Sequence, residues 1–256
     1  MATTDFSSAA FAQNPARQRL ETFFFPFMAV LILASVFLGF ARTFFLAPIY
    51  HYHLPNVLVA IHGVVFASWI ALFAIQTSLV AVGRTDLHRK LGVFGAVLVG
   101  LVFTMAYAVM LEGVHRGFTI PGQESISEHD RAQILALDVV GINFSFAMFV
   151  AGLLLRRNPD SHKRLMLFGT IAMIGPAIAR WPFAIIGSKP PLVGVVLQLF
   201  GIAVLVFDLL TTRRVHRATW IGVATLFLVP AIAIPLSTTP FWLNFLASLK
   251  QFLAHF

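Results

Sequence analysis

Cysteine is absent from this sequence of 256 residues, and charged residues make up only 11% of it. The absence of cysteine excludes disulfide bonds, cysteine–zinc sites and cysteine-ligated iron–sulfur clusters. A soluble domain carries roughly 25% charged residues, so too few are present here to cover a water-exposed surface. The sequence therefore argues against a soluble globular protein.

Long apolar runs dominate what is present, since hydrophobic residues make up 59% of the chain. About 20 consecutive apolar residues are enough for a helix to cross a bilayer. We predict an all-α polytopic membrane bundle of seven transmembrane helices plus a C-terminal interfacial amphipathic helix. The spans are expected at Thr22–Leu46, Pro55–Val82, Lys90–Glu112, Arg131–Leu155, Arg164–Gly187, Pro191–Leu210 and Thr219–Leu236.

Basic residues account for the net charge of +8, and their positions indicate membrane topology rather than nucleic-acid binding. Twelve of the 18 Lys and Arg residues precede the first span or lie in alternate connections between spans. Such residues favour the cytoplasmic side. The N-terminus is therefore expected in the cytoplasm and the C-terminus outside, in a bacterial inner membrane.

The two ends of the chain differ from the spans between them. Residues 1–21 are polar and lack the pattern of a cleavable signal peptide, so we expect a cytoplasmic N-terminal segment before the transmembrane domain at 22–238. In the tail, 239–256, Thr239 followed by Pro240 is typical of a helix start. Polar and apolar residues then separate onto two faces, which predicts an amphipathic helix in the outer interface.

Ionisable residues within spans are costly in a membrane and so mark candidate sites. His62, Asp138, Arg180 and Gln198 each lie seven residues from the expected outer end of a span, about 10 Å below the boundary. We predict that these residues form an outward-opening polar site for a small molecule or ion, with Asp138 and Arg180 as an ion pair. Residues expected at its mouth are Tyr107, Glu112 and Arg42.

A purely structural polar network is the alternative, because an Asp–Arg pair can lock two helices together and a histidine can bond a neighbouring helix. A second polar belt lies at the cytoplasmic ends of the spans and includes Asp208, which is expected to pair with one of its basic neighbours. Topology and contact with anionic lipid account for that belt without a ligand.

Two further features concern helix packing. Pro176 should kink the fifth span, because proline lacks the amide hydrogen that a helix interior requires. Small residues recur every four positions in the third span, from Gly92 through Gly100 to Ala108, which favours close approach of another helix.

Several short motifs recur along the second to fifth spans: His62–Gly63, Gln76, the Gly83–Arg84 and Leu87–His88–Arg89 segment before Gly92, and Asp160 with His162–Lys163–Arg164–Leu165–Met166 followed by Arg180. This pattern resembles a family of uncharacterised bacterial multi-pass membrane proteins. The resemblance covers roughly the second to fifth spans and implies a membrane bundle without an assigned activity. The placement of histidines near helix ends is also faintly similar to membrane b-type cytochromes.

Two alternative functions follow from the histidines, and whether the protein is an enzyme stays open. His88 and His162 both begin spans on the inner side, where they could hold haem b in a quinone-linked redox protein. Glu112 and His115 have the i, i+3 spacing of a zinc site in a membrane hydrolase, for which His62 or Asp138 would be the third ligand. The expected partners are the lipid bilayer and a small-molecule ligand, and a homo-oligomer is compatible with the sequence.

Overall fold

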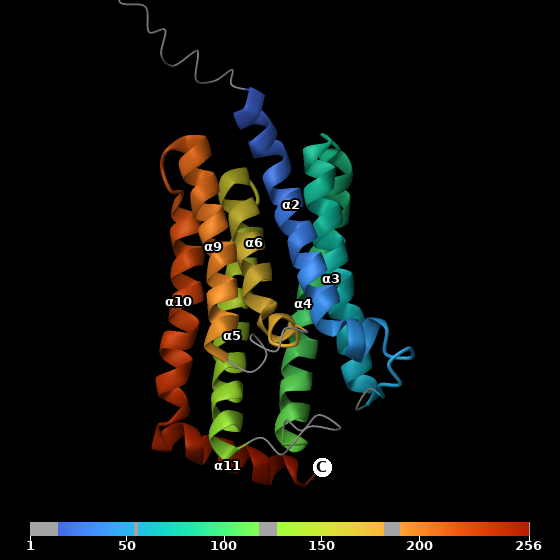
Figure 1. Ribbon diagram of the computed structural model, residues 1–256, viewed down its shortest axis with the longest axis vertical. Helices are drawn as coiled ribbons and strands as arrows, with labels where there is room; N and C mark the ends of the chain where they lie inside the picture. The colour runs from blue at the N-terminus through green and yellow to red at the C-terminus, as the bar shows by residue number, and fades with distance from the viewer. Residues whose placement is uncertain (1–14, 54–55, 118–126, 182–189, 256) are drawn as a thin grey trace, which may run out of the picture.

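The computed structural model describes residues 15–53, 56–117, 127–181 and 190–255, and every regular element among them is a helix. The helices form an elongated bundle (Figure 1), with bounds as follows: α2 Pro15–Phe40, its π-helical extension η1 Ala41–Phe45, α3 Val57–Ala81, α4 Thr85–His115, α5 Glu128–Leu154, α6 Pro159–Met173, α7 Gly175–Ile178, α9 Pro190–Thr212, α10 Arg217–Ser237 and α11 Pro240–Leu253.

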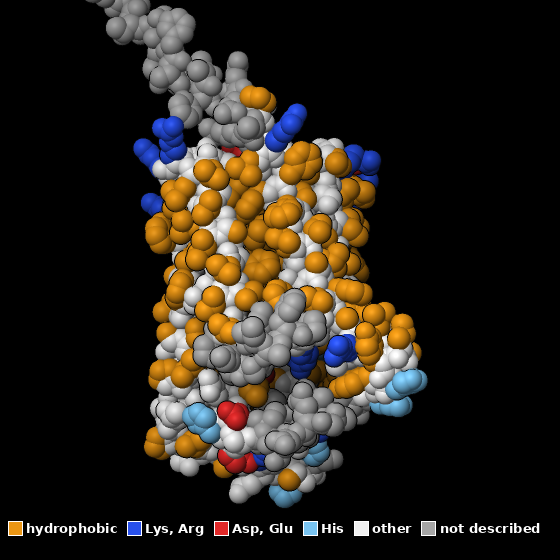
Figure 2. All heavy atoms as spheres, viewed as in Figure 1, with side chains coloured by type: hydrophobic (Ala, Val, Ile, Leu, Met, Phe, Trp, Pro, Cys, Tyr) orange, Lys and Arg blue, Asp and Glu red, His pale blue; other side chains and the backbone are white. Residues whose placement is uncertain are grey.

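Six helical stretches in the described part of the chain are long and apolar enough to cross a membrane. They are Gln18–Phe45, Val57–Ala81, Thr85–His115, Glu128–Leu154, Leu192–Thr212 and Arg217–Ser237. Large apolar side chains cover the outside of these helices, as the band of hydrophobic atoms in Figure 2 shows. Such extensive exposed apolar surface is unfavourable in water, so these findings indicate an integral membrane protein.

The fifth predicted span is not one continuous helix. The α-helix α6 ends at Met173, and a single turn, α7, follows from Gly175 to Ile178. Pro176 lies at the start of α7, where its missing amide hydrogen is tolerated, so the predicted kink is a complete break in the helix. The described part of the span predicted at Arg164–Gly187 is thus divided between two helices, and residues 182–189 of it lie outside the described residues.

Despite its short length, α6 is the most interior helix of the bundle. Leu167, Phe168 and Ile171 have no exposed surface, and the helix packs against α5, α9 and α10. The Ser145 hydroxyl on α5 donates a 2.8 Å hydrogen bond to the carbonyl oxygen of Gly169. The broken helix thus ends inside the bundle, and apolar side chains pack around its second half.

The two ends of the bundle have different chemistry. The α3–α4, α5–α6 and α9–α10 connections lie together at one end, which we call the basic end, and Figure 2 shows Lys and Arg side chains there. Helix α11 lies across the other end, called the α11 end (Figure 1). Its expected start is confirmed, since the Thr239 side chain caps the helix and Pro240 is its first residue.

A second, smaller core ties α11 to the bundle. Trp242 and Leu246 are buried against Leu135 of α5 and Met110 of α4. The indole nitrogen of Trp242 donates a 2.9 Å hydrogen bond to the carbonyl oxygen of Ala132. Because these contacts come from α4 and α5, α11 helps to hold the helices together at this end.

Candidate functional site

Arg180 follows directly after the broken helix, and its guanidinium group has few partners. Its Nη1 donates a 2.8 Å hydrogen bond to the carbonyl oxygen of Pro176, and the group lies 5.1 Å from the centre of the Phe40 ring. Among the described residues no carboxylate lies within ion-pair distance of it. The predicted direct pair between Arg180 and Asp138 is therefore not formed.

Arg180 is nevertheless close to two other predicted site residues. It interacts electrostatically with both His62 on α3 and Asp138 on α5, and also with Tyr52. The side chain of Arg180 is exposed, and that of Asp138 is half-buried. We call Arg180, His62, Asp138 and Tyr52 the Arg180 cluster.

His62 contributes an unsatisfied polar atom to this cluster. Its ring stacks on Phe66, with centroids 6.0 Å apart, and its Nδ1 atom is buried without a hydrogen-bond partner. The ring is held by α3, whose first turn is capped by the Asn56 side chain. Tyr52 was missed by the sequence analysis because it lies in the irregular segment between η1 and α3, where helical spacing carries no information.

The other residues expected at the mouth have different surroundings. Glu112 accepts hydrogen bonds from Asn56 Nδ2 at 2.5 Å and from Arg116 Nε at 3.1 Å, so it joins the start of α3 to the end of α4. Tyr107 packs partly buried against the second core, and the guanidinium of Arg42 lies 5.5 Å from the Tyr50 ring centre. None of these contacts involves the Arg180 cluster.

Gln198 and His115 are the remaining predicted site residues on the side of the Arg180 cluster. Gln198 is half-buried on α9, and in the described ranges it forms no hydrogen bond with a residue of the Arg180 cluster. His115 is exposed, and within the same ranges no group of three His, Asp or Glu residues converges to hold a metal ion. The Glu112–His115 pair therefore does not acquire a third ligand from the described residues.

His88 and His162 are brought together at the basic end, from the first turns of α4 and α6. Their ring centroids are 6.3 Å apart and the ring planes are nearly perpendicular, at 78°. His162 Nδ1 lies 2.8 Å from the carbonyl oxygen of Gly152, which selects the tautomer protonated at Nδ1 when the ring is neutral. His88 lies against the backbone of Gln76, and its Nδ1 is buried without a partner.

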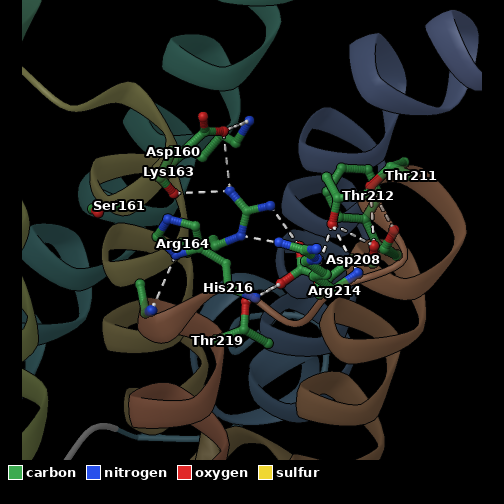
Figure 3. Close-up of polar contacts among 12 residues, drawn as sticks. Asp160, Ser161, Lys163, Arg164, Asp208, Thr211, Thr212, Arg214, His216 and Thr219 are labelled. Atoms are coloured by element: carbon green, nitrogen blue, oxygen red, sulfur yellow. Dashed lines mark hydrogen bonds and ion pairs between the residues drawn. The ribbon is translucent and has the colours of Figure 1, made fainter. Parts of the chain in front are cut away.

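The most deeply buried ion pair among the described residues lies elsewhere at the basic end, between Arg164 of α6 and Asp208 of α9 (Figure 3). Arg164 donates from Nε at 3.0 Å and from Nη2 at 2.5 Å to Asp208 Oδ1. The second oxygen, Oδ2, accepts from the Thr219 hydroxyl at 2.6 Å and from the His216 amide at 2.9 Å. Asp208 and Arg164 are 0% and 2% exposed, so the pair is buried and fully bonded.

This network joins α6, α9 and α10, and the basic partner that was expected for Asp208 is Arg164. Arg164 also donates to the backbone and side chain of Asp160 in its own helix. His216 caps α10, because its Nδ1 accepts a hydrogen bond from the Ala218 amide. Burial and the positive charge of Arg164 lower the pKa of His216, which keeps the ring neutral and able to accept that bond.

Comparison with protein-family models, with curated proteins and with solved structures finds no match to this chain. The function must therefore be inferred from the geometry of the chain itself. The Arg164–Asp208 network has all its polar groups satisfied, whereas the Arg180 cluster and the histidine pair retain groups that could bind something else.

Proposed function

We propose that this integral membrane protein binds a small anion, such as a carboxylate, at the Arg180 cluster. The observation that carries the proposal is the exposed guanidinium group of Arg180, which has no carboxylate within ion-pair distance among the described residues. Among the same residues only its Nη1 makes a hydrogen bond, so the other N–H donors can bind a ligand. A planar guanidinium binds a carboxylate through two parallel hydrogen bonds.

The neighbours of Arg180 suit this role. His62 can donate to an anion or accept a proton from an acid, because an imidazole titrates near neutral pH. Asp138 balances part of the arginine charge without occupying its hydrogen-bond donors. The cluster would thus favour a ligand with one negative charge over one with several.

The direction of access follows from a proposed seven-span topology. We count α6 and α7 as a fifth crossing that is broken before it reaches the α11 end, and α11 as an amphipathic helix in the interface. The basic end is then cytoplasmic by the positive-inside rule. Under this topology the Arg180 cluster opens to the outside of a bacterial inner membrane.

Substitution of Arg180 tests the proposal. Acetate, benzoate and inorganic phosphate should be titrated against the detergent-purified protein, with thermal unfolding as the readout. We expect at least one carboxylate to raise the Tm of the wild type, and Arg180→Gln to weaken that ligand by about ten- to a hundredfold, since hydrogen bonds to charged groups contribute roughly 1.5–3 kcal/mol. Arg180→Lys keeps the charge but loses the paired geometry and should bind at an intermediate level.

Arg42→Gln is the matched control, because Arg42 also lies beyond α2 but contacts Tyr50 instead of the cluster. It should bind like the wild type. Equal binding by wild type and Arg180→Gln, or no binding of any of the three anions by the wild type, would contradict the proposal.

Haem binding is a second candidate, supported by the convergence of His88 and His162. The hydrogen bond from His162 Nδ1 to a backbone carbonyl is the arrangement that orients an axial histidine and leaves Nε2 for the metal. If haem binds there, the purified protein should show a Soret band and sharpened α and β bands after dithionite reduction. His162→Ala should remove these bands, and a colourless wild-type preparation supplied with haem would exclude this function.

A further inference from the structure

Helix α3 carries a row of polar side chains along one face, and each has one buried polar atom without a hydrogen-bond partner. His62, Trp69 and Gln76 are seven residues apart, which places them on nearly the same side of a helix. On the neighbouring helix α4, His88 lies against the backbone of Gln76. Among the described residues, four of the five buried side-chain polar atoms without a hydrogen bond belong to these four residues, which we call the α3 polar row.

Other buried polar groups in this protein do find partners. The indole nitrogens of Trp181 and Trp242 donate to the carbonyl oxygens of Ser35 and Ala132. Trp69, by contrast, is 3% exposed and packs edge-on against Phe149, with its indole nitrogen unbonded. An unsatisfied buried group costs about 1–3 kcal/mol, so a row of them is not explained by helix packing.

The occupant that best fits the row is water. The polar atoms are spaced about 10 Å apart along α3, from one end of the membrane-crossing region toward the other. Histidine, tryptophan and glutamine together offer both donors and acceptors, and a buried water needs two to four such partners from protein or neighbouring waters. A file of single waters also needs far less room than an elongated organic ligand.

The two ends of the row carry groups that can exchange protons. His62 interacts electrostatically with Arg180, and His88 lies beside the ring of His162. Chains of ionisable residues within membrane helices commonly act as proton relays. Trp69 and Gln76 do not titrate near neutral pH, so they can only orient water between the ends.

We propose that the α3 polar row binds a file of water molecules that conducts protons between His62 and the His88–His162 pair. At each end a histidine takes a proton on one ring nitrogen and releases one from the other, so the charge moves and no bond to carbon changes. Between the ends the proton passes along the waters. The path shares His62 with the proposed anion site but does not require an anion to bind.

Proton flux in liposomes tests this directly. The full-length protein is reconstituted into phosphatidylcholine–phosphatidylglycerol vesicles with a pH-sensitive dye inside, and a potassium gradient with valinomycin sets the membrane potential. We expect the wild type to admit protons faster than empty vesicles. Gln76→Met, which removes the central polar group at similar volume, should lower the flux by about tenfold, the equivalent of one lost hydrogen bond of about 1.4 kcal/mol.

Two controls separate conduction from folding. Ser78→Ala lies on the same helix, where the hydroxyl already bonds the carbonyl oxygen of Ala74, and should leave the flux unchanged. Gln76→Glu restores a polar group and should keep the flux near that of the wild type. Gln76→Met should also hold or raise the Tm, because it removes an unsatisfied buried group.

Flux in the wild type no higher than in empty vesicles would overturn the proposal, as would equal flux in Gln76→Met. Carboxylate binding at Arg180 should persist in Gln76→Met, so failure of the path and failure of the anion site give different results.

Discussion

Replacing Asp208 with alanine should cost about 3–5 kcal/mol of folding free energy, because the buried guanidinium of Arg164 would lose its counter-ion. The pair is almost fully enclosed, and its Oδ2 also holds the Thr219 hydroxyl and the His216 amide at the start of α10. One substitution therefore removes bonds that join α6, α9 and α10. Thermal unfolding in detergent, followed by helical circular dichroism, measures the loss.

A double substitution separates the ion pair from its surroundings. Arg164→Met with Asp208→Leu removes both charges and keeps apolar volume, so it should be clearly more stable than Asp208→Ala alone. Asp86→Ala provides the control, because Asp86 pairs with Arg84 on the surface, where both side chains are mostly exposed. We expect no measurable change there. If Asp208→Ala unfolded at the same temperature as the wild type, the network would have no stabilising role.

Gly39→Ala should also have a large effect, because α2 and α7 touch at backbone level. A methyl group added at Gly39 would overlap the carbonyl oxygen of Ala177, and backbone cannot move aside as a side chain can. Overpacking a buried site typically costs about 1–3 kcal/mol, and contact with backbone places this site at the upper end. Since Ala177 is three residues before Arg180, the change should also displace Arg180 and weaken the carboxylate binding proposed above.

Gly100→Ala is the matched control in helix α4. No atom lies within 4 Å of a methyl group added there, so alanine should be tolerated or stabilise the helix by about 0.5–1 kcal/mol. Thermal unfolding and carboxylate titration of both variants check the prediction together. Wild-type stability in Gly39→Ala would show that α2 and α7 are free to separate.

Gly39 and Gly100 show that the spacing of small residues in the sequence did not predict which helices approach each other closely. The repeat of small residues in α4 predicted a close helix contact, yet Gly100 faces open space and Gly92 meets only the end of Gln76. Among the described glycines, the closest approach to the backbone of another helix lies instead at Gly39 of α2. Spacing shows that residues share a face, but the rotation of each helix against its neighbours determines what that face meets.

The same is true of the polar groups, because the sequence predicted their depth in the membrane and the tertiary structure determined their partners. Depth estimates from the sequence placed His62, Asp138, Arg180 and Gln198 at one level, and Arg180 does interact with the first two. Gln198 shows no such contact in the described ranges, and the expected Asp138–Arg180 ion pair is replaced by a bond from Arg180 to Pro176. The break after Met173 redirects the chain before Arg180, and a hydropathy pattern contains no signal for the direction in which it turns.

The amino-acid sequence by itself determined the properties that depend on local composition: helical spans long enough for a membrane, a basic end, and the capped start of α11 at Thr239 and Pro240. Tertiary structure alone decided which polar groups are satisfied. Arg164 and Asp208 are 44 residues apart and bonded to each other, while each residue of the α3 polar row has a buried polar atom without a partner. The reason is physical: hydropathy is a sum over neighbours in the chain, whereas a buried charge is stabilised only by the atoms that packing brings to it.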